Sequence, residues 1–156
     1  MRKTSVLRKR ESFNMAYAGD ISPTQAWEML VGEKARTVLV DVRTRPEWGF
    51  VGIPLLQQDM RAPVLEEWSF YPDMSLNTAF VPHVIQRLED EGLGKDTNLL
   101  FLCRSGVRSA AAAHALTSEG YSNCYNIIGG FEGDPDGEGH RGTVSGWKVE
   151  GLPWRQ

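Results

Sequence analysis

Two short hydrophobic runs without polar alternation stand out along the chain, at residues 37–43 and 98–102. Runs of this length and aliphatic content are typical of strands that are buried on both faces of a parallel sheet. A third strand is predicted over residues 121–128, just before a pair of glycines. The hydrophobic pattern therefore predicts a sheet built around these buried strands.

The segments between these runs carry hydrophobic residues at helical spacing. Ser22 fits the N-cap of a first helix and Pro23 its first position, while Gly32 suits its end. Further helices are predicted around residues 81–88 and from residue 106 or 107 to residue 119. Strands that alternate with helices indicate a parallel sheet covered on both faces, which gives a three-layer α/β/α domain.

The remaining stretches are less regular. Residues 1–18 are predicted to be a flexible basic arm. Residues 53–56 contain a proline and suit a short edge strand, and residues 57–80 are predicted to be rich in loops with a short helix near residues 63–68. The glycine-rich end of the chain is expected to wrap the surface, pinned by tryptophans such as Trp147.

Composition and charge narrow the possible partners. Hydrophobic residues make up 41% and charged residues 24% of the 156-residue chain, which is ordinary for a globular protein of one domain. Residues 1–10 carry five basic and no acidic residues, so the rest of the chain holds 12 basic and 20 acidic residues. An acidic body argues against nucleic acid as a partner, and no apolar run approaches the roughly 18 residues of a membrane span.

The chain has two cysteines, Cys103 and Cys124, which are too few for a disulfide framework. The expected compartment is therefore the reducing cytoplasm, where a free cysteine is either catalytic or part of the core. Cys124 lies within a predicted strand and is interpreted as core. Cys103 instead stands where a predicted strand gives way to a helix, which makes it the candidate for chemistry.

The loop that follows this strand gathers positive charge and backbone N–H groups. Its sequence is Cys103-Arg104-Ser105-Gly106-Val107-Arg108-Ser109. A helix N-terminus carries about half a positive charge together with unpaired N–H groups, a glycine lets the chain turn inward, and the two arginines add full charges. Because each of these favours a thiolate over a thiol, we expect a reactive cysteine in a loop that binds anions.

A thiolate held in this way can attack phosphorus in a phosphate ester, or it can attack sulfur. Cysteine-dependent phosphatases carry an arginine after five intervening residues, but Ser109 occupies that position here and Arg108 comes one residue early. No histidine precedes the cysteine, because Leu102 stands there. The loop is thus a residue short for wrapping a tetrahedral phosphate, and sulfur becomes the favoured target.

The loop closely resembles the active-site loop of rhodanese-domain sulfurtransferases. Three further segments resemble the family in the same order. Asp41-Val42-Arg43 with Glu47 matches its D-V-R … E segment, residues 120–131 match its G-[YF] … L-x-G-G segment, and residues 147–153 match its closing W … G-x-P. The resemblance implies a rhodanese-like domain over residues 19–156 with a five-stranded parallel sheet and with insertions near residues 57–80 and 132–146.

The resemblance also implies a reaction. Cys103 would take a sulfane sulfur from a small anionic donor such as thiosulfate, and would pass it from a persulfide to a thiol or cyanide-like acceptor. Backbone N–H groups from Arg104 to Ser109 would hold the persulfide, and Arg104 and Arg108 would attract the donor. By analogy, Arg43 would reach the loop and help to bind the donor, with Asp41 supporting the loop.

No cofactor and no metal are implied, and the three histidines are scattered along the chain. A phosphatase or arsenate reductase on a similar scaffold is the alternative enzyme. A rhodanese-like module in which Cys103 carries sulfur or oxidation only as a signal is the alternative outside enzymes. The physiological donor and acceptor, the oligomeric state and any protein partner do not follow from the sequence.

Overall fold

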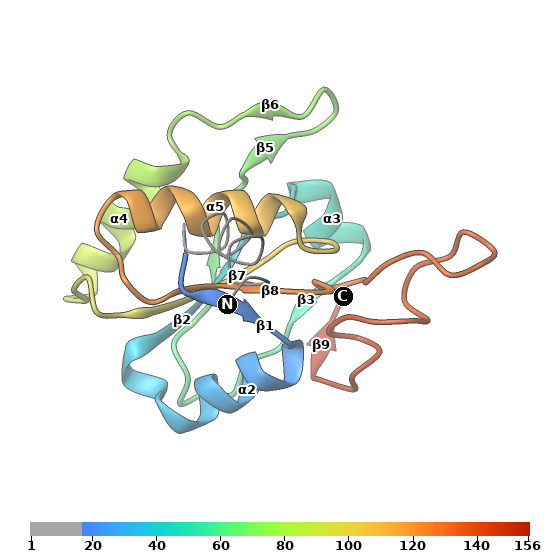
Figure 1. Cartoon of the computed structure of the whole chain (residues 1–156), viewed down its shortest axis with the longest axis horizontal. Coiled ribbons are helices and arrows are strands. Elements are labelled where there is room, and N and C mark those ends of the chain that lie inside the picture. Colours follow the sequence, from blue (N-terminus) through green and yellow to red (C-terminus); the bar gives the residue numbers. More distant parts are fainter. Residues whose placement is uncertain (1–16) are drawn as a thin grey trace, which may run out of the picture.

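A five-stranded parallel sheet forms the centre of the molecule, in the order β1-β8-β7-β2-β4 (Figure 1). The computed structural model describes residues 17–156, so the predicted arm at residues 1–18 lies almost wholly outside it. The strands are β1 (Gly19–Ile21), β2 (Thr37–Asp41), β4 (Val64–Leu65), β7 (Asn98–Leu102) and β8 (Cys124–Ile127). The predicted α/β fold with a five-stranded parallel sheet is confirmed.

Helices cover both faces of this sheet. Helix α2 (Pro23–Gly32) and the short η1 (Lys34–Arg36) lie on one face, and α4 (Phe80–Asp90) and α5 (Val107–Ser118) lie on the other (Figure 1). Alternate side chains of each buried strand enter different cores: Val38 and Val40 pack toward α4 and α5, whereas Leu39 packs toward α2. This explains why the strands read as unbroken apolar runs.

Side-chain caps fix the starts of two helices. The Ser22 hydroxyl accepts the Gln25 N–H, and the Gln25 side-chain oxygen accepts the Ser22 N–H, so the predicted N-cap Ser22 is part of a capping box. Thr44 and Glu47 form the same arrangement at α3 (Arg45–Phe50). The second box matters for function because it fixes the position of Glu47.

Two expectations for the middle of the chain are corrected. Strand β3 (Ile53–Pro54) is short, as predicted, but it pairs antiparallel with β9 (Trp154–Arg155), outside the main sheet. The short helix predicted near residues 63–68 is wrong, because the β-branched Val64 is buried and pairs with Val40 as part of the edge strand β4. Beyond it, β5 (Ser69–Phe70) and β6 (Ser75–Leu76) form an antiparallel hairpin that projects from the body (Figure 1).

The end of the chain is held by Trp147, as expected. This side chain is fully buried, its indole N–H donates to the Pro153 carbonyl at 2.7 Å, and its ring meets Trp27 edge-on at 6.0 Å between centroids. The loop between Glu132 and Gly146 reaches away from the sheet (Figure 1). Within residues 17–156, no helix is both long enough and apolar enough to cross a membrane.

Candidate functional site

Cys103 lies directly after β7, where the chain turns into α5. Gly106, the N-cap of α5, has φ +121°, a conformation that favours glycine. This turn brings the Gly106 N–H to 3.1 Å from the Cys103 Sγ atom, to which it donates a hydrogen bond. The cysteine is 1% exposed, so its sulfur sits inside the loop that the sequence predicted.

Most backbone N–H groups of this loop have no hydrogen-bond acceptor among residues 17–156. Within residues 17–156, five of them donate to no protein acceptor, namely those of Arg104, Ser105, Val107, Arg108 and Ser109. The first intrahelical bond of α5 runs from the Ala110 N–H to the Gly106 carbonyl. Unpaired N–H groups at the start of a helix form a binding site for an anion.

A chain of hydrogen bonds extends from the sulfur into the protein. The Ser109 hydroxyl is fully buried, lies 3.1 Å from the Cys103 sulfur and donates to the Asn126 side-chain oxygen at 2.6 Å. The Asn126 amide donates in turn to the Asp20 carboxylate at 3.1 Å, which also accepts the Tyr17 hydroxyl at 2.7 Å. This network fixes the Ser109 hydroxyl beside the sulfur.

The segment after β8 supports the loop from behind. The Phe131 N–H donates to the Cys103 carbonyl at 2.8 Å, and the N–H groups of Glu132 and Gly133 donate to the Arg104 carbonyl at 3.0 and 3.1 Å. A Cβ at Gly130 would lie 2.5 Å from the Cys103 carbonyl oxygen, so only glycine fits this approach. The Gly129-Gly130-Phe131 sequence therefore acts as a backbone brace for the Cys103 loop.

Arg108 is engaged by a carboxylate of the neighbouring helix. Its two terminal nitrogens donate to the two oxygens of Glu47 at 2.7 and 2.9 Å, and both side chains are largely buried. Burial alone would raise the pKa of Glu47, but the bonds from Arg108 and from the Thr44 N–H lower this pKa from 4.5 to about 2. The charge of Arg108 is thus balanced within the protein.

Arg104 is the exposed cation of the loop. Within the part of the chain that the structure describes, its guanidinium forms no ion pair and no side-chain hydrogen bond. Both arginines were predicted to attract an anionic donor. The structure distinguishes them, because Arg104 offers an unbalanced charge and Arg108 does not.

Arg43 lies elsewhere than expected. Its guanidinium donates to both oxygens of Asp41, at 2.9 and 2.7 Å, and to the Gly52 carbonyl at 2.9 Å. It is fully buried and stacks over the Phe131 ring at 4.2 Å. Arg43 therefore contacts Phe131, whose N–H binds the Cys103 carbonyl, while its Nη1 atom has no hydrogen-bond partner among residues 17–156. Its part in donor binding stays a prediction.

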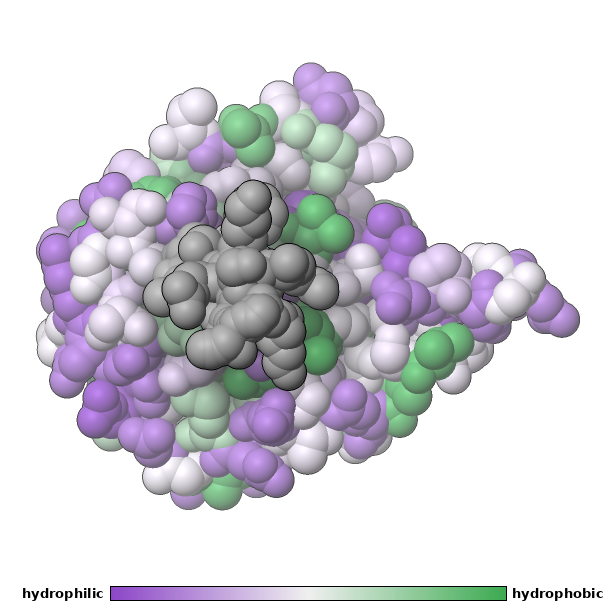
Figure 2. Space-filling model, viewed as in Figure 1, coloured by the Kyte–Doolittle hydropathy of each residue, from purple (hydrophilic) through white to green (hydrophobic). Residues whose placement is uncertain are grey.

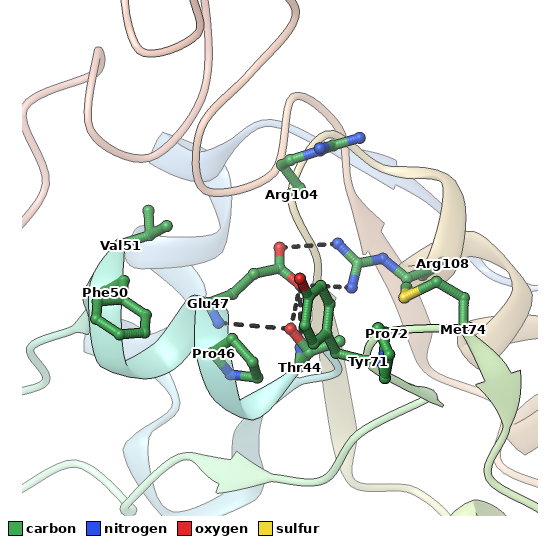
Figure 3. A pocket seen from close by; sticks show the side chains of 10 residues that line it. All are labelled: Thr44, Pro46, Glu47, Phe50, Val51, Tyr71, Pro72, Met74, Arg104 and Arg108. Atoms are coloured by element: carbon green, nitrogen blue, oxygen red, sulfur yellow. Dashed lines mark hydrogen bonds and ion pairs between the residues drawn. The ribbon is translucent and has the colours of Figure 1, made fainter.

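A cavity of about 690 Å³ lies beside the loop (Figure 3). Helix α3, the hairpin β5–β6 and the loop itself form its walls. Its lining residues are Thr44, Pro46, Glu47, Phe50, Val51, Tyr71, Pro72, Met74, Arg104 and Arg108. Cys103 does not line it, but Arg104 and Arg108, which follow the cysteine in its loop, do, so the cavity borders the reactive loop.

Cys124 belongs to the core, as predicted. It is fully buried on β8 among the side chains that face α4 and α5. Burial raises the pKa of its thiol to about 11. This thiol is therefore protonated and enclosed under ordinary conditions.

Sequence reasoning missed several contributors to the site. Asn126 and Asp20 were not singled out, although a polar residue within a buried strand is a signal that a specific partner exists. The hairpin wall, with Tyr71 and Met74, lay in a stretch that was predicted only as loop. Glu47 was noted as part of a motif, but its pairing with Arg108 follows only from the fold.

Comparison with known proteins assigns the family. Residues 22–134 match the model of the rhodanese-like domain. The chain belongs to this family. The match spans four of the five strands of the main sheet, β2, β4, β7 and β8, together with the Cys103 loop and Gly129-Gly130-Phe131.

The relatives carry little functional description. An uncharacterized protein of Rickettsia conorii is 39% identical over 136 residues, which cover 87% of this chain and 96% of that protein. The chain is 48% identical to that in the crystal structure of Rv0390 from M. tuberculosis. The two structures superpose with a TM-score of 0.77 over 90% of this chain and 98% of the Rv0390 chain. A more distant relative is the thiosulfate sulfurtransferase GlpE of Glaesserella parasuis, 28% identical over 121 residues, which cover 73% of this chain and 83% of that protein.

Proposed function

We propose that this rhodanese-like domain is a sulfurtransferase that carries a sulfane sulfur on Cys103. One observation carries the proposal: the sulfur accepts the Gly106 N–H at 3.1 Å while five further N–H groups of the loop lack a protein acceptor among residues 17–156. A persulfide places an additional anionic sulfur within such a ring of donors. The name of the Glaesserella parasuis relative, a thiosulfate sulfurtransferase, points the same way.

The reaction divides into two displacement steps. The Cys103 thiolate attacks the outer sulfur of a donor such as thiosulfate, the sulfur–sulfur bond of the donor breaks, and sulfite leaves with the electron pair. An acceptor nucleophile then attacks the outer sulfur of the persulfide and releases the Cys103 thiolate. Neither step needs a general base, a metal or a redox cofactor.

The residues around the sulfur have distinct parts in these steps. The exposed guanidinium of Arg104 attracts the anionic donor. The loop N–H groups, of which that of Gly106 already lies 3.1 Å from the sulfur, hold the negative charge of the persulfide and of the thiolate that leaves in the second step. Arg108 is balanced by Glu47 and shapes the loop more than it binds the donor.

The proposal is tested by steady-state assay with thiosulfate and cyanide. Thiocyanate should form at a rate that depends on Cys103, with the parallel-line kinetics of a double-displacement reaction. A rate no higher than that of Cys103→Ala contradicts the proposal. Hydrolysis of an aryl phosphate above the Cys103→Ala level would instead identify a phosphatase.

A further inference from the structure

The cavity beside the Cys103 loop is larger and more apolar than a small inorganic donor requires. Its volume of about 690 Å³ lies within the range of about 300–1,000 Å³ that is usual for pockets that bind organic ligands. Phe50 and Val51, at the end of α3, line one part of it, and Tyr71 and Met74 of the hairpin line another (Figure 3). Thiosulfate has no apolar surface to place against these side chains.

Large hydrophobic side chains remain exposed around this cavity. Phe50 is 82% exposed and Tyr71 is 65% exposed, while Val107, in the loop itself, is 79% exposed. Figure 2 shows hydrophobic residues among hydrophilic ones on the part that projects at the top of the view. Exposed apolar side chains that gather around one site mark a surface for a partner. A polypeptide segment across the mouth can cover Val107 as well, whereas a small molecule within the cavity leaves Val107, which does not line it, in water.

The charges of the site are consistent with a thiolate or an acidic group on this partner. Glu47 and Arg108 balance each other, so Arg104 supplies the net positive charge of the lining. A second copy of the chain offers no separate acceptor, because its Cys124 is fully buried in the core and transfer to its Cys103 would only exchange sulfur between identical loops.

We propose that the sulfur acceptor is a polypeptide that presents a cysteine between apolar side chains. These side chains enter the cavity between α3 and the hairpin β5–β6, and the cysteine thiolate lies near Arg104. The proposal rests on the sulfurtransferase function given above. The acceptor thiolate attacks the outer sulfur of the Cys103 persulfide, the bond between the two persulfide sulfurs breaks, and Cys103 leaves as a thiolate with the electron pair. The acceptor becomes a perthiolate, and no oxidant or reductant is consumed.

The test uses the full chain loaded with thiosulfate and freed of excess donor. Two capped pentapeptides serve as acceptors, each with a central cysteine that is flanked by leucines in one and by serines in the other. Loss of sulfur from the protein and its gain by the peptide are followed by mass spectrometry. Burial of the leucine side chains predicts a second-order transfer rate about tenfold higher for the leucine peptide.

Two variants on the same hairpin place the effect in the cavity. Tyr71 and Leu76 are each 65% exposed, but only Tyr71 lines the cavity. Tyr71→Ser should bring the leucine peptide down to within about twofold of the serine peptide, while Leu76→Ser should keep the tenfold preference. Thiosulfate should load Leu76→Ser as fast as it loads the unaltered protein, and transfer from each variant is measured on protein that has already been loaded.

The possible failures are separable. Equal rates for the two peptides with a loaded protein, or a preference that survives Tyr71→Ser, overturn the polypeptide acceptor and leave the proposed function intact. An uncharged benzyl thiol that matches the leucine peptide in rate assigns the cavity to small organic thiols and also overturns it. Failure of thiosulfate to load Cys103 contradicts the proposed function. In that case, binding in the cavity is tested by adding the leucine peptide to the protein and following the NMR signals of Tyr71. Signals that do not change overturn the peptide site.

Discussion

The ion pair between Glu47 and Arg108 should contribute strongly to stability, and Glu47→Gln removes its charge while it keeps the capping group of α3. The pKa of Glu47 falls from 4.5 to about 2 on folding, which corresponds to about 3 kcal/mol at 1.36 kcal/mol per unit. Because the side chain of Glu47 is still 18% exposed, solvent screening reduces this figure, and we expect a loss of about 2 kcal/mol. For a chain of this size, that loss lowers Tm by about 4–8 °C.

The pH dependence gives this prediction its sign. The pKa of Glu47 is depressed in the folded state, so its stabilisation is fully present above pH 4.5 and is lost as the pH falls through 2. Urea unfolding followed by tryptophan fluorescence should therefore show a difference between the variant and the unaltered protein that shrinks to less than half between pH 7 and pH 3. Arg87→Gln, which breaks the exposed pair of Arg87 with Glu91, should cost only about 0.5 kcal/mol. A Glu47→Gln loss that equals this control, or that is the same at both pH values, refutes the reasoning.

Two further predictions concern the glycine brace and the second cysteine. Gly130→Ala should destabilise the protein by about 2–3 kcal/mol and impair sulfur loading, because its Cβ would lie 2.5 Å from the Cys103 carbonyl oxygen and from the Arg104 carbonyl carbon. The control is Gly92→Ala, at φ +73° with open space around it. This variant should cost only about 1 kcal/mol of the free energy of unfolding in urea. Equal losses at the two glycines would show that close approach to the loop is not the cause. In the Cys103→Ala variant, Cys124 is the remaining cysteine, and the folded protein should take no iodoacetamide label at pH 8, because this thiol is fully buried with a pKa of about 11. Rapid labelling that precedes unfolding would contradict the place of Cys124 in the core.

The fold was largely predictable because its strongest signals are local. The strand at Asn98–Leu102 and the helix that starts at Val107 follow from an apolar run, a loop and an alanine-rich segment, and the structure places both where the pattern predicted them. The third strand was predicted over residues 121–128 but spans Cys124–Ile127. Strand β1 was missed, since Gly19–Ile21 is too short to show a pattern and forms only by pairing with β8.

The site was predictable only where its parts are adjacent in sequence. The Cys103 loop needs just the residues that follow β7, so its motif is visible in the chain itself. The pair of Glu47 with Arg108 joins residues 61 apart, and no local pattern specifies it. The type and position of Arg43 suggested an anionic donor, whereas the anion that its guanidinium binds in the structure is the Asp41 carboxylate two residues earlier.

The most direct test of the central claim is the intact mass of the protein after incubation with thiosulfate and removal of the excess. The unaltered chain should gain about 32 Da, the mass of one sulfur atom, and should lose it again on addition of cyanide. Cys103→Ala should gain nothing. No added sulfur on the unaltered protein, or an equal gain on Cys103→Ala, would contradict a persulfide carried by Cys103.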